Sequence, residues 1–248
     1  MKRSIKPTAY SNPIFRFRLQ KSLNLIDAKE VESCLIEIPF FEPLTNFAIN
    51  TPRVRISPLR GRKASMHHFN AVVLAGGQSS RMGQDKALLE IDGESLLLRS
   101  QRILKELGAQ SVAVCRNDGA EQSIQDIYPD SGPLGGIHAA LMANSALPTL
   151  VIPVDLPLIN TDDLYELIQL GFANQCSSHF TGLYIPIFIW NPAEILESLT
   201  ARLEEGKRLS LRSFFESHKR AEVTLKDETA LANANTPQEW QAILEQAN

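Results

Sequence analysis

A glycine-rich stretch followed by cations is the part of this chain whose residue types best suit chemistry. Gly76 and Gly77 follow the apolar run Ala71–Leu74, and the cations Arg81 and Lys86 come shortly after them. An apolar strand, a glycine turn and positive charges together bring backbone N–H groups and cations to a phosphate chain. The plain alternative is a tight turn with solvated cations, because glycine-rich turns are common.

Several other kinds of site are not indicated. The dinucleotide-binding fingerprint G-x-G-x-x-G is absent, and the G-K-[ST] of a P-loop does not follow the glycines. The nucleophile motif G-x-S-x-G is also absent, and the histidines form no H-E-x-x-H pattern. Any metal in this protein is therefore expected to be a hard ion held by oxygen.

The whole string from 71 to 89, AVVLAGGQSSRMGQDKALL, is far more specific than its glycines. It closely resembles the signature LAGG-x-S-x-RMG-x-DKALL of the molybdenum cofactor guanylyltransferases (MobA), which belong to the wider nucleotidyltransferase superfamily. The resemblance implies that Arg81 and Lys86 are catalytic and neutralise a triphosphate, and that Lys86 also binds the nucleotide. It further implies that the following four consecutive residues bind the nucleotide: Leu74, Ala75, Gly76 and Gly77.

Asp155 follows the apolar segment 149–154 directly. An aspartate at such a strand end is by itself a capping or turn residue. Here the local pattern P-x-D-x-P matches the metal-binding element of the same family. The resemblance therefore implies that Asp155 is catalytic, contacts the nucleotide and holds Mg²⁺, which takes one or two protein carboxylates and completes its shell with phosphate oxygens and water.

Two further segments resemble the family. The segment 130–136, DSGPLGG, is by itself a flexible turn, but relatives have an acidic nucleotide-binding residue a few positions before GPL-x-G. Asp126 matches that acid best, and Asp130 is the competitor. The closing segment 233–239, NANTPQE, resembles the terminal N-x-N-T-P-x-[DE] of the family and also predicts a capped helix entry.

One segment departs from the family. Relatives often have S/N-A-N-R after the second strand, where this chain has Cys115-Arg116-Asn117-Asp118. The asparagine that contacts the nucleotide there cannot be located, and Asn117 is the candidate.

Apolar runs alternate with helical patterns from residue 66 onward, which predicts an α/β protein with a three-layer α/β/α, Rossmann-like arrangement and a mostly parallel sheet. The resemblance implies that this is the nucleotidyltransferase fold. Ligands of such sheets bind beyond the carboxyl ends of the strands, where Gly76 and Asp155 both stand. Strands are expected at 71–74, 111–115, 149–154, 183–190 and 222–225. Helices are expected at 96–107, 138–146, 162–171, 194–205, 209–217 and from 236 onward. Pro186 indicates an edge position or a bulge for the fourth strand.

The composition is ordinary for a globular protein, with 248 residues that are 44% hydrophobic and 21% charged. No apolar run approaches the roughly 18–20 residues needed to span a bilayer. Cys34, Cys115 and Cys176 are far apart and odd in number, so they predict reduced thiols in a cytoplasmic protein.

Charge divides the chain into two predicted parts. Residues 1–65 carry 12 Lys and Arg against 5 Asp and Glu, whereas the remainder carries 13 against 23. The prediction is a basic N-terminal extension at 1–65, poorly ordered or an overlong gene start before Met66. The resemblance implies a nucleotidyltransferase domain at 66–248. The acidic balance of that domain does not indicate a nucleic-acid groove.

The resemblance implies transfer of GMP from GTP to molybdenum-bound molybdopterin, with release of pyrophosphate and formation of the molybdopterin guanine dinucleotide cofactor. It also implies transient contacts with molybdenum cofactor biosynthesis proteins and target molybdoenzymes. The acidic charge and the lack of a long apolar run predict no nucleic-acid or membrane partner. The alternatives are a cytidylyltransferase or sugar-phosphate enzyme of the same fold, or a non-catalytic nucleotide-binding module. LAGG favours the guanylyl type over the LAAG of cytidylyl relatives, the G-x-G-x-R-x-x-P-x-T pattern of sugar enzymes is missing, and intact Arg81, Lys86 and Asp155 argue against a non-catalytic module.

Overall fold

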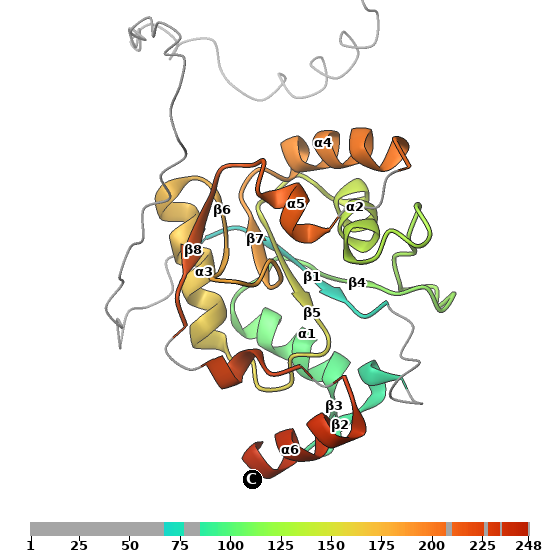
Figure 1. Ribbon diagram of the computed structural model, residues 1–248, viewed down its shortest axis with the longest axis vertical. Coiled ribbons are helices and arrows are strands. Elements are labelled where there is room, and N and C mark those ends of the chain that lie inside the picture. Colours follow the sequence, from blue (N-terminus) through green and yellow to red (C-terminus); the bar gives the residue numbers. More distant parts are fainter. Residues whose placement is uncertain (1–66, 77–84, 207–209, 226–227, 234, 248) are drawn as a thin grey trace, which may run out of the picture. The chain divides into compact units, whose positions relative to one another are not determined.

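A six-stranded, mostly parallel sheet forms the centre of the protein (Figure 1). The computed structural model describes residues 67–76, 85–206, 210–225, 228–233 and 235–247, and the predictions for 1–65 lie outside these ranges. Only β7 runs antiparallel to its neighbours among the described strands of this sheet. Across the sheet the strands are β4 (Val112–Cys115), β1 (Asn70–Leu74), β5 (Thr149–Pro153), β7 (Ile187–Ile189), β6 (Ser177–Phe180) and β8 (Arg220–Val223).

Helices cover both faces of this sheet, as the alternating pattern predicts. On β1, Ala71 and Val73 point into one core while Val72 and Leu74 point into the other, because successive strand residues face opposite sides. One core is shared with α1 (Leu96–Glu106), α3 (Thr161–Asn174) and α6 (Pro237–Ala247). The other is shared with α2 (Pro133–Ala143), α4 (Pro192–Glu204) and α5 (Leu211–Phe215). The predicted three-layer α/β/α fold is confirmed, and no helix in the described ranges is long and apolar enough to cross a membrane.

A short anchored segment links β1 to α1. It contains the 3₁₀ turn η2 (Lys86–Leu88) and a hairpin of β2 (Glu90–Ile91) and β3 (Glu94–Ser95). Asp92 and Gly93 form the hairpin turn with φ of 55° and 77°, which is why an Asp-Gly pair suits it. Ala87, Leu89 and Ile91 are buried in the core beside α1, so this segment is fixed to the domain at alternate residues.

Strand β6 was not predicted, because its sequence Ser-Ser-His-Phe lacks an apolar run. Its polar side chains are nevertheless buried, and each is bonded to the backbone. Ser178 Oγ donates to the carbonyl of Leu167 at 2.6 Å, and His179 Nδ1 donates to the carbonyls of Phe180 and Leu183, each at 2.9 Å. These bonds offset the cost of burying polar groups, so a polar strand can occupy the interior.

Two further boundaries differ from the sequence prediction. Helix α2 begins at Pro133 and not at His138, because a proline suits the first turn of a helix and the two following glycines lie inside it. A Cβ at Gly136 would lie 3.0 Å from Leu74 Cδ2, so these glycines permit close packing and are not loop residues. Strand β7 lies inside the sheet and not at its edge, because Pro186 precedes the strand and removes no N–H from it.

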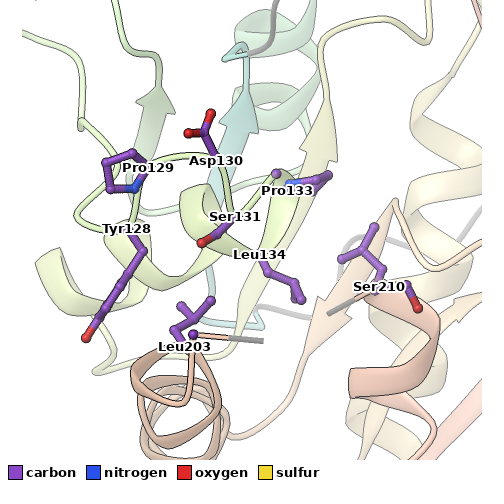
Figure 2. A pocket seen from close by; sticks show the side chains of 11 residues that line it. Tyr128, Pro129, Asp130, Ser131, Pro133, Leu134, Leu203 and Ser210 are labelled. Atoms are coloured by element: carbon purple, nitrogen blue, oxygen red, sulfur yellow. The ribbon is translucent and has the colours of Figure 1, made fainter. Parts of the chain in front are cut away.

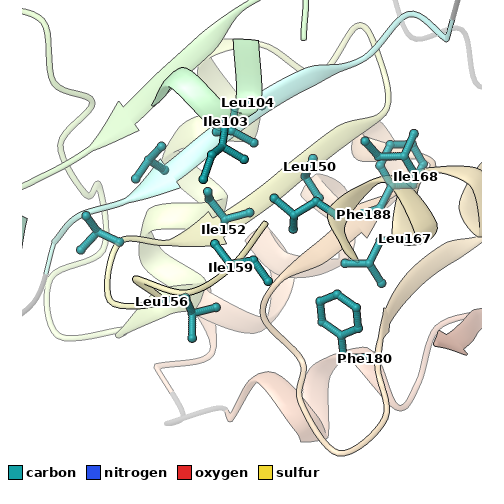
Figure 3. Close-up of a cluster of buried hydrophobic side chains, with 14 of the residues drawn as sticks. Ile103, Leu104, Leu150, Ile152, Leu156, Ile159, Leu167, Ile168, Phe180 and Phe188 are labelled. Carbon is teal, nitrogen blue, oxygen red and sulfur yellow. The ribbon is translucent and has the colours of Figure 1, made fainter. Parts of the chain in front are cut away.

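The larger core contains a tight contact between α3 and β7, and Figure 3 shows part of this cluster, including Phe188. Phe188 is fully buried, and its ring packs against the backbone of Gly171 in α3. A Cβ placed on Gly171 would lie 2.2 Å from Cδ1 and 2.7 Å from Cε1 of that ring. The helix therefore carries a glycine here in spite of the low helix propensity of this residue.

We expect Gly171→Ala to lower the free energy of unfolding by about 1–2 kcal/mol. Overpacking a core costs about 1–3 kcal/mol, whereas the better helix propensity of alanine returns at most about 1 kcal/mol. Chemical denaturation measures the difference. In a Phe188→Leu background the same substitution should cost less, and a Gly171→Ala protein as stable as the wild type would contradict this account of the contact.

Candidate active site

The carboxyl ends of β4, β1 and β5 lie side by side, and the segments that leave them carry most of the predicted site residues. Two backbone hydrogen bonds extend the pairing past the strand ends: Ala75 N donates to Cys115 O at 2.9 Å, and Val154 N donates to Leu74 O at 3.0 Å. The three exits are thus held in a fixed register. Leu74, Ala75 and Gly76 stand at the middle exit, whereas Gly77 and Arg81 lie outside the described residues.

Lys86 lies at the start of η2, close to this edge. Asp85 Oδ1 accepts a hydrogen bond from Ala87 N at 3.0 Å and so caps the turn. The ammonium group of Lys86 donates to Asp155 Oδ2 at 3.1 Å, with side-chain exposures of 17% and 25% for the pair. The structure therefore brings together two of the predicted catalytic residues.

Asn235 also contacts Lys86, at the far end of the chain. Its Oδ1 accepts a hydrogen bond from Lys86 Nζ at 2.6 Å. The predicted helix entry is present too: Glu239 Oε2 accepts from Asn235 N at 2.8 Å and from Thr236 N at 3.0 Å. Thr236 Oγ1 accepts from Glu239 N at 3.2 Å, which completes a capping box. The sequence signal for Asn235 as a site residue was its position in the terminal N-x-N-T-P pattern. Sequence reasoning assigned that pattern only to helix capping.

Asp126 lies in the segment that follows β4, in contact with Asn117. Its Oδ2 accepts from Asn117 Nδ2 at 3.0 Å, and its N donates to Asn117 Oδ1 at 2.9 Å. Asn117 Nδ2 is 3.9 Å from the position a Cβ would take on Gly76, and Asp126 Oδ2 is 3.3 Å from the corresponding position on Gly135 in the first turn of α2. Asp126 is thus linked both to the glycine segment and to the helix start.

Asp130, the competitor of Asp126, has a different setting. It has a φ of 61° and borders a cavity of about 690 Å³ between the loop before α2 and the end of α4 (Figure 2). Tyr128, Leu134 and Leu203 contribute apolar walls to this cavity. The geometry around Gly76 therefore favours Asp126 over Asp130 as the acid beside the glycine segment.

Arg116 is a further charged residue at the β4 exit, and sequence reasoning assigned it no role. Its guanidinium is only 16% exposed and pairs with two carboxylates. Arg116 Nη2 donates to Asp85 Oδ2, and Arg116 Nε lies 2.5 Å from Asp118 Oδ2. It occurs where the chain departs from the family pattern, so the family signature gave no signal for it.

A metal at this site would depend on Asp155. The described residues contain no group of three or more His, Cys, Asp or Glu side chains that could hold a metal. A lone carboxylate does not fit a structural zinc site. It does fit a hard divalent ion that takes its other ligands from phosphate and water.

The chain is similar to known proteins in sequence and in fold. Residues 71–222 match the family described as the MobA-like NTP transferase domain. A molybdenum cofactor guanylyltransferase from Xanthomonas euvesicatoria pv. vesicatoria is 38% identical over 181 residues, which cover 71% of this chain and 94% of that protein. A protein of the same name from Vibrio cholerae is 34% identical over 181 residues, covering 68% and 87%.

Solved structures share the fold at lower identity. The molybdopterin-guanine dinucleotide biosynthesis protein A from Archaeoglobus fulgidus has a TM-score of 0.56 at 20% identity, covering 72% of this chain and 96% of that one. The 2-C-methyl-D-erythritol 4-phosphate cytidylyltransferase from Thermus thermophilus has a TM-score of 0.57 at 14% identity, covering 73% and 98%. Proteins whose names specify different nucleotides thus share this architecture.

Cys115 lies directly beneath the site but is not suited to act as a nucleophile. It is 2% exposed, and its Sγ donates to the carbonyl of Gly136 at 3.3 Å. Burial, with a smaller contribution from the charge of Asp126, raises the pKa of the Cys115 thiol to about 12. The thiolate, which is the reactive form, is therefore suppressed at neutral pH.

We expect Cys115 to resist iodoacetamide at pH 8 in the folded protein and to react once the protein is unfolded in denaturant. An unfolded thiol with a pKa near 8.5 is roughly a quarter ionised at that pH, whereas a pKa of about 12 leaves about one part in 10⁴ as thiolate. Mass spectrometry of the Cys115 peptide measures the labelling. Equal rates in the folded and unfolded states would contradict the assignment of a buried neutral thiol.

Proposed function

The chain belongs to the family of MobA-like NTP transferases, and we propose that within this family it transfers GMP from GTP to molybdenum-bound molybdopterin. It is then a molybdenum cofactor guanylyltransferase, releasing pyrophosphate and forming the molybdopterin guanine dinucleotide cofactor. The observation that carries this proposal is the 3.1 Å contact between Lys86 and Asp155 beside the β1 exit. This contact joins a cation and a carboxylate near the carboxyl ends of parallel strands, and ligands of such sheets bind at those ends, which supports the proposal.

The reaction needs positioning and charge neutralisation more than covalent catalysis. A phosphate oxygen of the acceptor attacks the α-phosphorus of GTP, and the bond to the β-phosphate breaks as pyrophosphate leaves. Backbone groups at Leu74–Gly77 would hold the nucleotide, and Asp126 would contact it from the far side of Gly76. Lys86 and Arg81 would stabilise the charge that grows on the leaving pyrophosphate.

Asp155 has a second role in this proposal. Its carboxylate would hold Mg²⁺, which supplies charge neutralisation at the phosphate oxygens when it is bound. Lys86 orients the Asp155 carboxylate through their ion pair. Asn235 fixes the other side of the ammonium group, so the lysine is aimed by two partners.

We expect GTP to bind far more tightly than CTP or ATP in the presence of Mg²⁺, because the LAGG and GPL-x-G segments resemble the guanylyl type. Isothermal titration with the three nucleotides, with and without Mg²⁺, measures this. Pyrophosphate release with molybdenum-bound molybdopterin then tests the transfer itself. Equal or tighter binding of CTP would overturn the guanylyl assignment in favour of a cytidylyltransferase and leave the fold untouched.

Lys86→Ala and Asp155→Asn should each lower turnover by roughly 10²–10³, about 3–4 kcal/mol of transition-state stabilisation. Each removes a charge that acts as pyrophosphate leaves, and neither side chain belongs to the apolar cores. The control is Arg102→Ala, which removes the exposed ion pairs of Arg102 with Glu94 and Glu106 and should leave turnover unchanged. A Lys86→Ala protein that is folded and still releases pyrophosphate at a normal rate would remove Lys86 from the mechanism.

A further inference from the structure

Arg116 is tied to the turn that carries Lys86. Its own position is fixed, because Arg116 N donates to Ile124 O at 2.9 Å and its Cα lies 3.8 Å from the Cβ position on Gly76. Its partner Asp85 uses both carboxylate oxygens: Oδ1 caps η2 through Ala87 N, and Oδ2 accepts from Arg116 Nη2. A continuous chain of contacts therefore runs from Arg116 at the end of β4 to Asp85, and from Asp85 to the backbone of Ala87, which follows Lys86.

Two features make this connection more than a surface ion pair. The Arg116 side chain is 16% exposed, so water screens its pair with Asp85 less than it screens an exposed pair. Asp85 adjoins Lys86 in the sequence, so a shift of the Asp85 cap moves the backbone that directs the lysine.

We propose that Arg116 is a positioning residue for the transfer reaction: through Asp85 it holds η2 so that the Lys86 ammonium stays at the edge of the sheet. This inference rests on the proposed function and adds to it a residue outside the family signature. Arg116 acts through Asp85 and not by contact with the substrate. Its loss should therefore affect the chemical step more than nucleotide capture.

The variants Arg116→Ala, Asp85→Asn and their combination test this coupling in the full-length protein. We expect Arg116→Ala to lower kcat for pyrophosphate release from GTP by about tenfold, since displacing a catalytic group by about 1 Å can cost up to about 10²-fold. KM for GTP should change less than threefold, and the melting temperature should stay within a few degrees. If both residues act through one contact, the double variant should be no slower than the slower single variant, within twofold.

Two matched variants separate positioning from a merely structural role. Asp118→Asn breaks the other ion pair of Arg116 without touching η2 and keeps the Asp118 Oδ1 contact to Ala120 N, so kcat should stay within twofold of the wild type. Arg116→Lys keeps a cation that can reach one carboxylate, so it should recover most of the kcat lost in Arg116→Ala. A structural arginine would instead lower the melting temperature and the folded fraction, with kcat per folded molecule unchanged.

These experiments distinguish a failure of the Arg116 inference from a failure of the proposed function. If the wild type releases no pyrophosphate from GTP, the proposed function fails, and this inference fails with it. If the wild type is active and Arg116→Ala keeps its kcat, or if Arg116→Ala and Asp85→Asn act additively, the inference alone is overturned.

Discussion

A partly buried ammonium group needs partners that stay in place, and this requirement connects distant parts of the domain. The side chain of Lys86 is 17% exposed, its charge is paired with Asp155 from the β5 exit, and Asn235 from the segment before α6 accepts a hydrogen bond from it. These partners are 69 and 149 positions away in the sequence. The contact can form only after β1, β5 and the C-terminal segment have assembled, so the site is a product of the completed fold. Unpaired, the same ammonium would lose hydration without compensation.

The parts of the fold that the sequence predicted are those whose local pattern and burial agree. Strands β1 and β5 are short apolar runs buried on both faces, and their bounds fall within about one residue of the prediction. Strand β6 was not predicted because its buried polar side chains bond to backbone carbonyls through Ser178 Oγ and His179 Nδ1, and a hydropathy pattern does not record such bonds. The start of α2 was predicted too late because glycine usually marks a turn, whereas here the approach of Leu74 and Tyr128 requires it inside a helix.

The candidate site also contains some residues that the sequence predicted and others that it did not. Lys86 and Asp155 were identified from resemblance to a family, and the structure places them in contact. Asn235 contacts Lys86, and Arg116 contacts Asp85. Both contacts join residues that are far apart in the sequence, so a local sequence pattern does not predict them. Base selectivity is a further case, since the same architecture occurs in a protein named as a cytidylyltransferase. The fold alone therefore does not determine which base is bound.

The charge balance explains why local cations matter in this protein. The chain beyond residue 65 carries 13 Lys and Arg against 23 Asp and Glu, so its overall field repels a triphosphate. Salt screens that repulsion beyond about 8–10 Å. Whether a triphosphate binds therefore depends on the groups that are in contact with it. A lysine ammonium has three donors. Among the described residues Asp155 and Asn235 take two of them, and in the proposed function the third would donate to a phosphate oxygen. Lys86 would then bind phosphate without giving up the ion pair that orients Asp155, and an acidic domain would hold a polyanion at one prepared point.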